Sequence, residues 1–156
     1  MVIDQDVTGE INQGILLFLG VQKTDGALEA DRLLQKILNY RIFPDSAEKM
    51  NLSLSDVRGG LLVVSQFTLA ADTKKGLRPS FSSAAPPEIA ERLYDYFLAQ
   101  ASVHHTSVHS GQFGANMQVS LCNDGPVTFM PVSYTHLRAH ETSLHLVCRL
   151  LLEKKG

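Results

Sequence analysis

The sequence predicts a single α+β domain, and three features of the chain support this class. Its 156 residues are a normal size for one domain with one hydrophobic core. Its hydrophobic fraction of 44% and charged fraction of 19% are typical of a soluble globular protein. Strand patterns are interleaved with the patterns of two helices, without the repeated strand–helix–strand units of a doubly wound sheet.

Four segments have the pattern of strands. Ile15–Leu19 is a continuous apolar run between two glycines, which predicts a strand buried on both faces. Leu61–Val64 is a second buried strand, and it also follows a pair of glycines. Arg41–Phe43 predicts a short strand that ends at a proline. Residues 117–122 alternate apolar and polar side chains, as expected for a half-buried strand.

Two segments have the spacing of amphipathic helices. Either Thr24 or Asp25 can cap the first helix, whose apolar stripe is Ala30, Leu33, Leu34, Ile37 and Leu38. The second begins at Pro86-Pro87, where missing N–H groups cost little. Its predicted stripe is Ile89, Leu93, Tyr96 and Phe97.

Charge and cysteine content restrict the classes of function. The net charge of −2 at pH 7 argues against a protein that coats nucleic acid non-specifically, although it permits RNA binding through a local patch. Lys74, Lys75 and Arg78 form such a cluster, and it is either a solvated loop or an RNA contact. Two cysteines do not make a disulfide framework.

The location and the ligands follow from what the sequence lacks. No apolar run is long enough to cross a bilayer, so we expect no membrane partner. The first fourteen residues contain no apolar signal-peptide core, and a reducing cytoplasm is therefore the expected location. His136 and His140 have i, i+4 spacing near Cys148, but no Cys-x-x-Cys or His-Glu-x-x-His pattern accompanies them. We expect no metal site and no cofactor.

Two polar motifs stand beside apolar strands. The first is Ser65-Gln66-Phe67-Thr68-Leu69, and the second is Asn123-Asp124-Gly125-Pro126-Val127-Thr128. By itself the first is an ordinary strand end, and the second has the residues of an ordinary turn. Ser65 lacks the Gly-x-Ser-x-Gly elbow of serine hydrolases, and Thr128 has no evident activating base.

Taken together and in this order, the motifs resemble the two signature motifs of D-aminoacyl-tRNA deacylases. The similarity runs from about Val7 to Phe129 and includes Arg78–Pro87. It implies a mixed sheet closing toward a barrel with two flanking helices, a D-aminoacyl-tRNA deacylase-like fold, in a homodimer. It also implies hydrolysis of the ester between tRNA and a D-amino acid or glycine, which makes aminoacylated tRNA the partner.

The resemblance further implies roles for individual residues. Backbone N–H groups around Gln66 and Phe67 would hold the scissile carbonyl, as in an oxyanion hole. Ser65 and Thr68 would position the substrate, and Thr128 would orient groups rather than attack. The attack itself would depend mainly on the vicinal hydroxyl of the terminal ribose of the tRNA.

Chiral selection is implied for the second motif. Gly125 and Pro126, joined by a cis bond, would enter the active site of the partner subunit, and their carbonyls would meet the α-amino group of the substrate. The same backbone would clash with an L side chain and not with the hydrogen of a D residue. Further implied contacts are Ala84 and Met117 for the substrate, and Lys74, Lys75 and Arg78 for tRNA.

Both ends of the chain differ from the family pattern. The family opens with a strand carrying a Gln-Arg-Val run, which this sequence lacks, so we expect an unpaired sheet edge. We therefore expect a deacylase domain over residues 1–130 without its first strand. Residues 131–156 have no counterpart in the family and resemble spurious read-through sequence. We expect them to pack poorly, and their removal to change the free energy of unfolding by no more than about 1 kcal/mol.

Two other functional classes are alternatives to the deacylase. One is a folded nucleic-acid-binding module without catalysis, which loss of the first strand favours. The other is an inactive fragment of the family. Deacylation of D-Tyr-tRNA compared with L-Tyr-tRNA distinguishes the enzyme from both.

Overall fold

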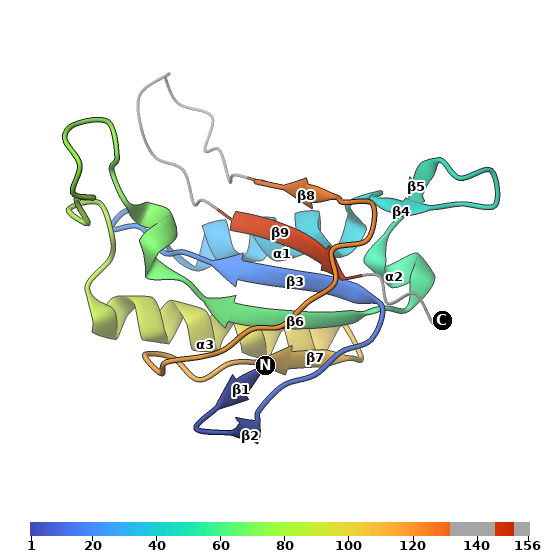
Figure 1. Ribbon diagram of the computed structural model, residues 1–156, viewed down its shortest axis with the longest axis horizontal. Helices are drawn as coiled ribbons and strands as arrows, with labels where there is room; N and C mark the ends of the chain where they lie inside the picture. Colours follow the sequence, from blue (N-terminus) through green and yellow to red (C-terminus); the bar gives the residue numbers. More distant parts are fainter. Residues whose placement is uncertain (132–145, 152–156) are drawn as a thin grey trace.

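The computed structural model describes residues 1–131 and the backbone of residues 146–151. Its centre is a mixed five-stranded sheet in the order β7-β6-β3-β9-β8 (Figure 1). From one edge to the other, the strands are Val108–Ser110, Gly60–Ser65, Gly14–Leu19, Leu146–Leu151 and Thr128–Phe129. The mixed α+β class predicted from the sequence is confirmed. The sheet is open across the described residues, and closure toward a barrel stays a prediction.

Smaller elements surround the sheet. Two ribbons pair β1 (Val2–Ile3) with β2 (Asp6–Val7), and β4 (Phe43–Pro44) with β5 (Met50–Leu52). The helices are α1 (Ala27–Asn39), the short α2 (Leu54–Val57), the 3-10 helix η1 (Phe67–Ala70) and α3 (Pro87–His104). None of the helices described here has the length and apolar character needed to span a membrane.

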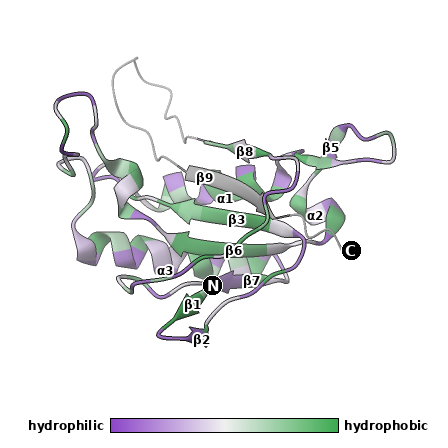
Figure 2. Cartoon of the chain, in the orientation of Figure 1, coloured by the Kyte–Doolittle hydropathy of each residue, from purple (hydrophilic) through white to green (hydrophobic). Residues whose placement is uncertain are grey.

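The two buried strands predicted from apolar runs form the middle of the sheet. β3 and β6 run parallel in register, from Gly14 beside Gly60 to Leu19 beside Ser65. A side chain at Gly14 would collide with the backbone of Gly60, so close pairing requires a glycine there. Figure 2 shows both strands as strongly hydrophobic, as expected when each of their faces is covered.

Helices α1 and α3 cover one face of this sheet. The stripe predicted for α1 is confirmed, since all five of its residues are buried. The predicted cap is wrong: Gly26 is the N-cap, and its N–H donates to Glu29 Oε2 at 2.9 Å. The two helices are joined by the Tyr96 hydroxyl, which donates to Asp31 Oδ1 at 2.9 Å.

The stripe predicted for α3 is displaced by about one residue. Ile89 is 42% exposed, whereas the buried residues are Ala90, Tyr94, Phe97 and Ala101. The two alanines allow the helix to lie close to the sheet, because small side chains reduce the separation that packing requires. The larger apolar residues beside them are therefore only partly covered.

Residues 117–121 cover part of the opposite face. Met117, Val119 and Leu121 are half-buried against a second core cluster that contains Leu16 and Leu62. The predicted alternation of burial is confirmed. The predicted ladder is not, since among residues 1–131 the backbone pairing of this segment is a single bridge between Gln118 and Val2.

Strand β9 occupies the position between β3 and β8. Its six residues pair antiparallel with all of β3, and it also pairs with Thr128 and Phe129. This backbone pairing of β9 was not expected from the sequence, and the predicted small cost of removing the segment after residue 130 stays a prediction. Across the described residues the sheet ends at β7 and β8, and β3 has a neighbour on each side. The expected unpaired edge stays a prediction. His136 and His140 lie outside the described residues.

Candidate active site

A cavity of about 490 Å³ opens where the parallel strands β3 and β6 end. This volume lies within the range of roughly 300–1,000 Å³ of small-molecule sites. The carboxyl ends of parallel strands are also where open sheets usually bind ligands. Five residues predicted from the sequence line this cavity together: Ser65, Gln66, Phe67, Ala84 and Met117.

The backbone turn after β6 supplies a free donor to the cavity. Gln66 N–H continues the sheet by donating to Leu19 O at 2.8 Å. Phe67 then begins η1, and the first N–H groups of a helix have no acceptor within it. Across the described residues, no acceptor is found for the N–H groups of Phe67 and Thr68. The Gln66 N–H is therefore used within the sheet, and of the two predicted donors the Phe67 N–H is the one that remains free at the cavity lining.

Side chains hold this turn in place. Gln66 Nε2 donates to Thr68 Oγ1 at 2.6 Å, which spans the start of η1. Thr68 itself does not line the cavity. Its predicted role in positioning the substrate stays a prediction.

The part of the cavity lining that contains Ala84 is hydrogen-bonded to the loop that follows β3. Ala85 N–H donates to Val21 O at 3.0 Å, and Lys23 N–H donates to Ser83 O at 3.2 Å. That loop is closed by Asp25, whose Oδ2 accepts the Gln22 N–H at 2.6 Å. Burial raises the pKa of the Asp25 carboxyl to about 6, although the Gln22 hydrogen bond opposes the shift.

Tyr94 and Phe113 line the cavity and were missed by the sequence prediction. The Tyr94 hydroxyl donates to Val63 O at 3.0 Å and to Gly111 O at 3.3 Å. Its ring packs against Phe113 with centroids 5.9 Å apart. Burial raises the pKa of Tyr94 to about 12, so the hydroxyl stays protonated near neutral pH. Ala90, Tyr94 and Phe97 are spaced at i, i+4 and i+7. This spacing is the signal in the sequence that could have identified the buried face of α3, to which Tyr94 belongs.

The cavity contains no general base among its described lining residues. They include no aspartate, glutamate, histidine, lysine or cysteine. Tyr94 is the titratable group there, and it holds its proton. Ser65 therefore has no partner that could activate it as a nucleophile.

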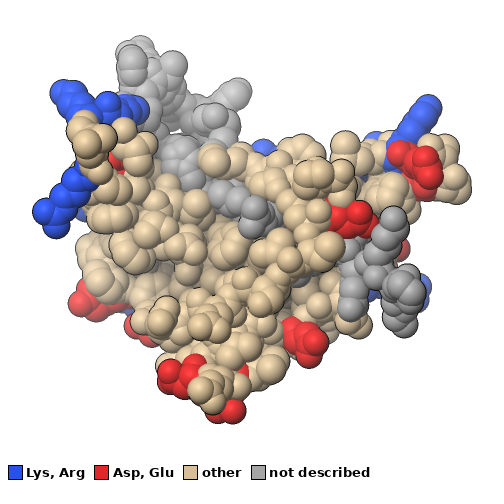
Figure 3. Space-filling model, in the orientation of Figure 1, with Lys and Arg blue, Asp and Glu red and all other residues tan. Residues whose placement is uncertain are grey.

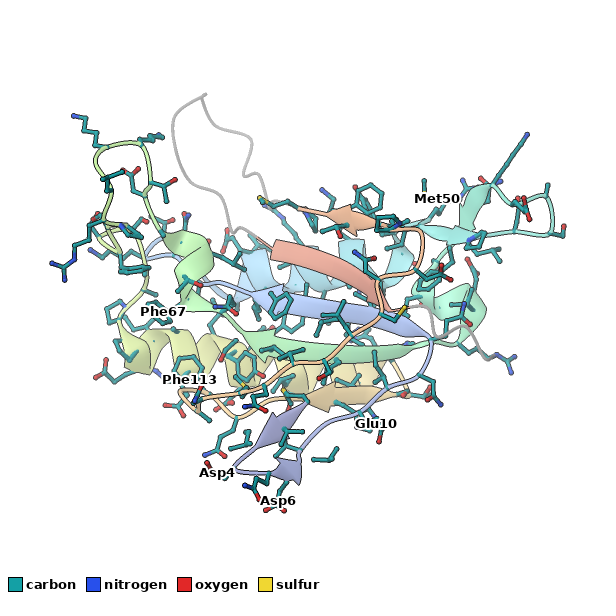
Figure 4. All side chains as sticks on the ribbon, viewed as in Figure 1. Asp4, Asp6, Glu10, Met50, Phe67 and Phe113 are labelled. Carbon is teal, nitrogen blue, oxygen red and sulfur yellow. The ribbon has the colours of Figure 1, made fainter. Side chains whose placement is uncertain are left out.

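An aromatic pair lies at the mouth of the cavity. The rings of Phe67 and Phe81 are 5.1 Å apart, and these residues are 61% and 41% exposed. Figure 4 shows Phe67 and Phe113 at the same end of the molecule, with Glu10 farther from both.

The basic cluster follows η1 in an exposed loop. Asp72 and Ser80 pair across the base of this loop, which carries Lys74, Lys75 and Arg78. Lysine and arginine side chains gather over this end in Figure 3, and acidic side chains lie over the β1–β2 ribbon. The loop that follows η1 therefore forms a basic patch beside the cavity.

The second motif lies away from the cavity. The Gly125–Pro126 bond is cis, which confirms the prediction for that bond. Thr128 aligns through β9 with Leu16 of β3, and β8 runs in the same direction as β3. Residues 123–127 therefore lie toward the Gly14 end of the sheet, whereas the cavity lies at its Leu19 end. Gly125, Pro126 and Thr128 do not line the cavity of their own chain.

The fold and the cavity define a small α+β protein with an apolar pocket that offers a backbone N–H donor and no general base. The chain belongs to the D-Tyr-tRNA(Tyr) deacylase family, whose model matches residues 1–131. It is 64% identical to the D-aminoacyl-tRNA deacylase of Cellvibrio japonicus (strain Ueda107), over 82% of this chain and 88% of that protein. It is 66% identical to the D-aminoacyl-tRNA deacylase of Pseudoalteromonas translucida (strain TAC 125), over 81% and 88% respectively.

Solved structures show the same fold. One, described as the c-Myc DNA Unwinding Element Binding Protein, matches with a TM-score of 0.77 and 38% identity, covering 81% of this chain and 86% of that one. A second, described as a probable eukaryotic D-amino acid tRNA deacylase, matches with a TM-score of 0.51 over 68% of this chain and 87% of that one. Its 16% identity supports the fold alone.

Proposed function

We propose that this protein hydrolyses the ester bond of D-aminoacyl-tRNA, and of glycyl-tRNA, in the cytoplasm. One structural observation carries the proposal: Ser65, Gln66 and Phe67 of the first motif line one cavity with Ala84 and Met117, and the described lining offers a free Phe67 N–H and no general base. The family membership and the names of relatives more than 60% identical support the same substrate class.

The free amide is suited to the charge that develops in ester hydrolysis. Water adds to the carbonyl carbon, and the carbonyl oxygen becomes negative. Collapse of the intermediate breaks the bond to the ribose oxygen, which receives a proton that came from the water. The free N–H of Phe67, a residue that lines the cavity, would stabilise that oxygen, as in an oxyanion hole. The products are a free amino acid and tRNA.

The substrate must contribute to the chemistry because the cavity lacks a base. Tyr94 keeps its proton near neutral pH, and Ser65 has no activating partner among the described lining residues. We assign the activation and orientation of water to the vicinal hydroxyl of the terminal ribose. The protein then contributes position and electrostatic stabilisation, both of which can be large in a preorganised site.

A second copy of the chain would complete the site. The Gly125–Pro126 tip is exposed and lies at the opposite end of the sheet from the cavity of its own chain. In a homodimer the tip of one protomer would enter the cavity of the other. Its backbone carbonyls would bind the α-amino group and would exclude an L side chain by contact. Thr128, at the base of the tip, would orient it.

The tRNA would approach from the side of the basic loop. Lys74, Lys75 and Arg78 lie in the loop beside the cavity, where they could contact phosphates (Figure 3). The exposed rings of Phe67 and Phe81 offer a surface on which the terminal base can stack.

The test uses the full chain with D-Tyr, D-Asp, glycyl and L-Tyr esters of tRNA. We expect cleavage of the first three and rejection of L-Tyr-tRNA, because a steric wall does not read side-chain identity. Cleavage of L-Tyr-tRNA at a rate near that of D-Tyr-tRNA would refute chiral rejection. Cleavage of one D substrate alone would indicate a side-chain-specific esterase instead.

Two further measurements test the assignment of the chemistry. Ser65→Ala should keep kcat within about tenfold, since loss of a true nucleophile costs several orders of magnitude. A D-Tyr-tRNA that lacks the vicinal hydroxyl should be cleaved about 10²-fold more slowly or worse, the usual scale of acid–base assistance. An unchanged rate with that substrate would contradict tRNA-assisted catalysis.

The alternative is a nucleic-acid-binding module without catalysis. The structure that matches at 38% identity carries a title that names DNA binding, which favours this alternative. Tight tRNA binding with no release of amino acid from any of the four esters would support the module.

A further inference from the structure

The side chain of Asn123 closes the loop that carries the exposed Gly125–Pro126 tip. Its Oδ1 accepts the Val127 N–H at 3.0 Å, and its Nδ2 donates to Thr128 Oγ1 at 2.9 Å. Both ends of one amide group are therefore used, and each bond crosses the base of the tip. An asparagine can do this because its side chain offers an acceptor and a donor side by side.

The chain that leaves the tip is anchored in the core. Val127 and Phe129 are half-buried and pack against the main hydrophobic cluster. The ring of Phe129 meets Tyr40 edge to face, with centroids 5.5 Å apart. The Asn123 amide therefore joins the chain that enters the tip to Val127 and Thr128. That part of the chain is held in place by the packing of Val127 and Phe129.

The tip has little other support in its own chain. Gly125 and Pro126 are exposed, and no side-chain hydrogen bond to either is found in the described part of the structure. Gly125 has φ of +131°, and a Cβ there would lie 2.6 Å from Val127 Cγ2. The conformation therefore requires a glycine, and glycine by itself provides no rigidity.

We propose that Asn123 is a positioning residue for chiral selection. By joining Asn123 to Val127 and Thr128, its amide fixes the direction of the Gly125 and Pro126 carbonyls that form the steric wall. The proposal rests on the proposed function, in which this tip enters the cavity of a partner copy. Rejection of an L side chain depends on contact, so a wall that can yield by a fraction of an ångström loses selectivity before it loses activity.

The experiment measures kcat/KM for D-Tyr-tRNA and L-Tyr-tRNA with the full chain and its Asn123 variants. Asn123→Ala removes both bonds and should lower the D-to-L ratio by at least about tenfold, mainly through faster cleavage of L-Tyr-tRNA. Asn123→Asp keeps the acceptor for Val127 N–H and can accept from the Thr128 hydroxyl, so it should restore most of the ratio. Asn39→Ala removes an exposed asparagine that bonds only within its own helix, and it should change nothing.

The outcomes separate the inference from the proposed function. If the unmodified chain cleaves L- and D-Tyr-tRNA equally, or neither, the proposed function fails. If the unmodified chain discriminates and Asn123→Ala keeps the same ratio, or lowers both rates equally, the inference alone is overturned. Thermal melting identifies a variant that does not fold. In that case Asn123→Ser, whose shorter hydroxyl can reach only one partner, takes its place, and an intermediate ratio supports the inference.

Discussion

Truncation of the chain after Met130 removes β9 and leaves β3 and β8 without the strand that joins them. All six residues of β3 are paired with β9, from Gly14 beside Leu151 to Leu19 beside Leu146. A backbone hydrogen bond contributes roughly 0.5–1.5 kcal/mol net to stability. A ladder with about one bond per pair therefore predicts a loss of about 3 kcal/mol or more in the free energy of unfolding.

A point substitution tests the same ladder without shortening the chain. Cys148 lies in register with Leu17 on one side and Phe129 on the other. Proline has no N–H and is not tolerated in a central strand, so Cys148→Pro should be strongly destabilising. Cys148→Ala keeps the backbone donor and is the matched control.

Urea unfolding followed by circular dichroism measures the stability of each variant, and hydrogen exchange of the β3 amides reports on the ladder directly. We expect fast exchange after truncation and after Cys148→Pro for the β3 amides that face β9, while those that face β6 stay protected, and slow exchange of both sets in the control. Two results together would refute the reasoning. The truncated chain would have a free energy of unfolding within about 1 kcal/mol of that of the full chain, and Cys148→Pro would be as stable as Cys148→Ala. The expectation from the sequence, that this segment packs poorly, would then be correct.

Three other predictions concern the site and its surroundings. Tyr94→Phe removes a buried hydroxyl that donates to the carbonyls of Val63 and Gly111, and the Val63 carbonyl keeps the Gly111 N–H as a donor. The free energy of unfolding measured in urea should fall by about 1 kcal/mol. A fall above about 3 kcal/mol would mean that the ring has also moved. The raised pKa of Asp25 means that the fold favours its protonated form, so this contribution is complete below the ordinary value of 3.8 and is lost as the pH rises through about 6. Asp25→Asn should therefore be more stable than the unmodified chain above pH 6 and nearly equal to it below pH 4, and a difference that does not vary with pH would contradict this origin. The double substitution Lys75→Glu and Arg78→Glu should weaken tRNA binding. It should also reduce the slope of log binding constant against log salt concentration by about one for each phosphate that the two cations neutralise. An unchanged slope would mean that the tRNA binds elsewhere.

Local patterns in the sequence were sufficient for the elements whose burial is periodic. The stripe of α1 and the apolar runs of β3 and β6 are read correctly, because each residue type there matches the face that the element must bury. The residues of the first motif were also identified. They are consecutive in the chain, and strand β6, which leads into them, ends at the cavity.

The α3 stripe shows where such patterns are insufficient. Hydrophobicity favoured Ile89, but the structure buries Ala90 and Tyr94. The separation between the helix and the sheet selects small residues, and a cavity at the end of the sheet selects a tyrosine whose hydroxyl can reach two carbonyls. Neither requirement is visible before the helix and the sheet have been placed together.

The sequence by itself determined the class, the two central strands, the first helix and the two motifs, because these depend on residues close together in the chain. Only the tertiary structure decided that Ser65, Ala84 and Met117 share one cavity, that the tip at Gly125 lies at the other end of the sheet, and that β9 lies beside β3. These relations join segments that are tens of residues apart. They follow from strand order and register, which pairing between distant backbones decides and local periodicity does not.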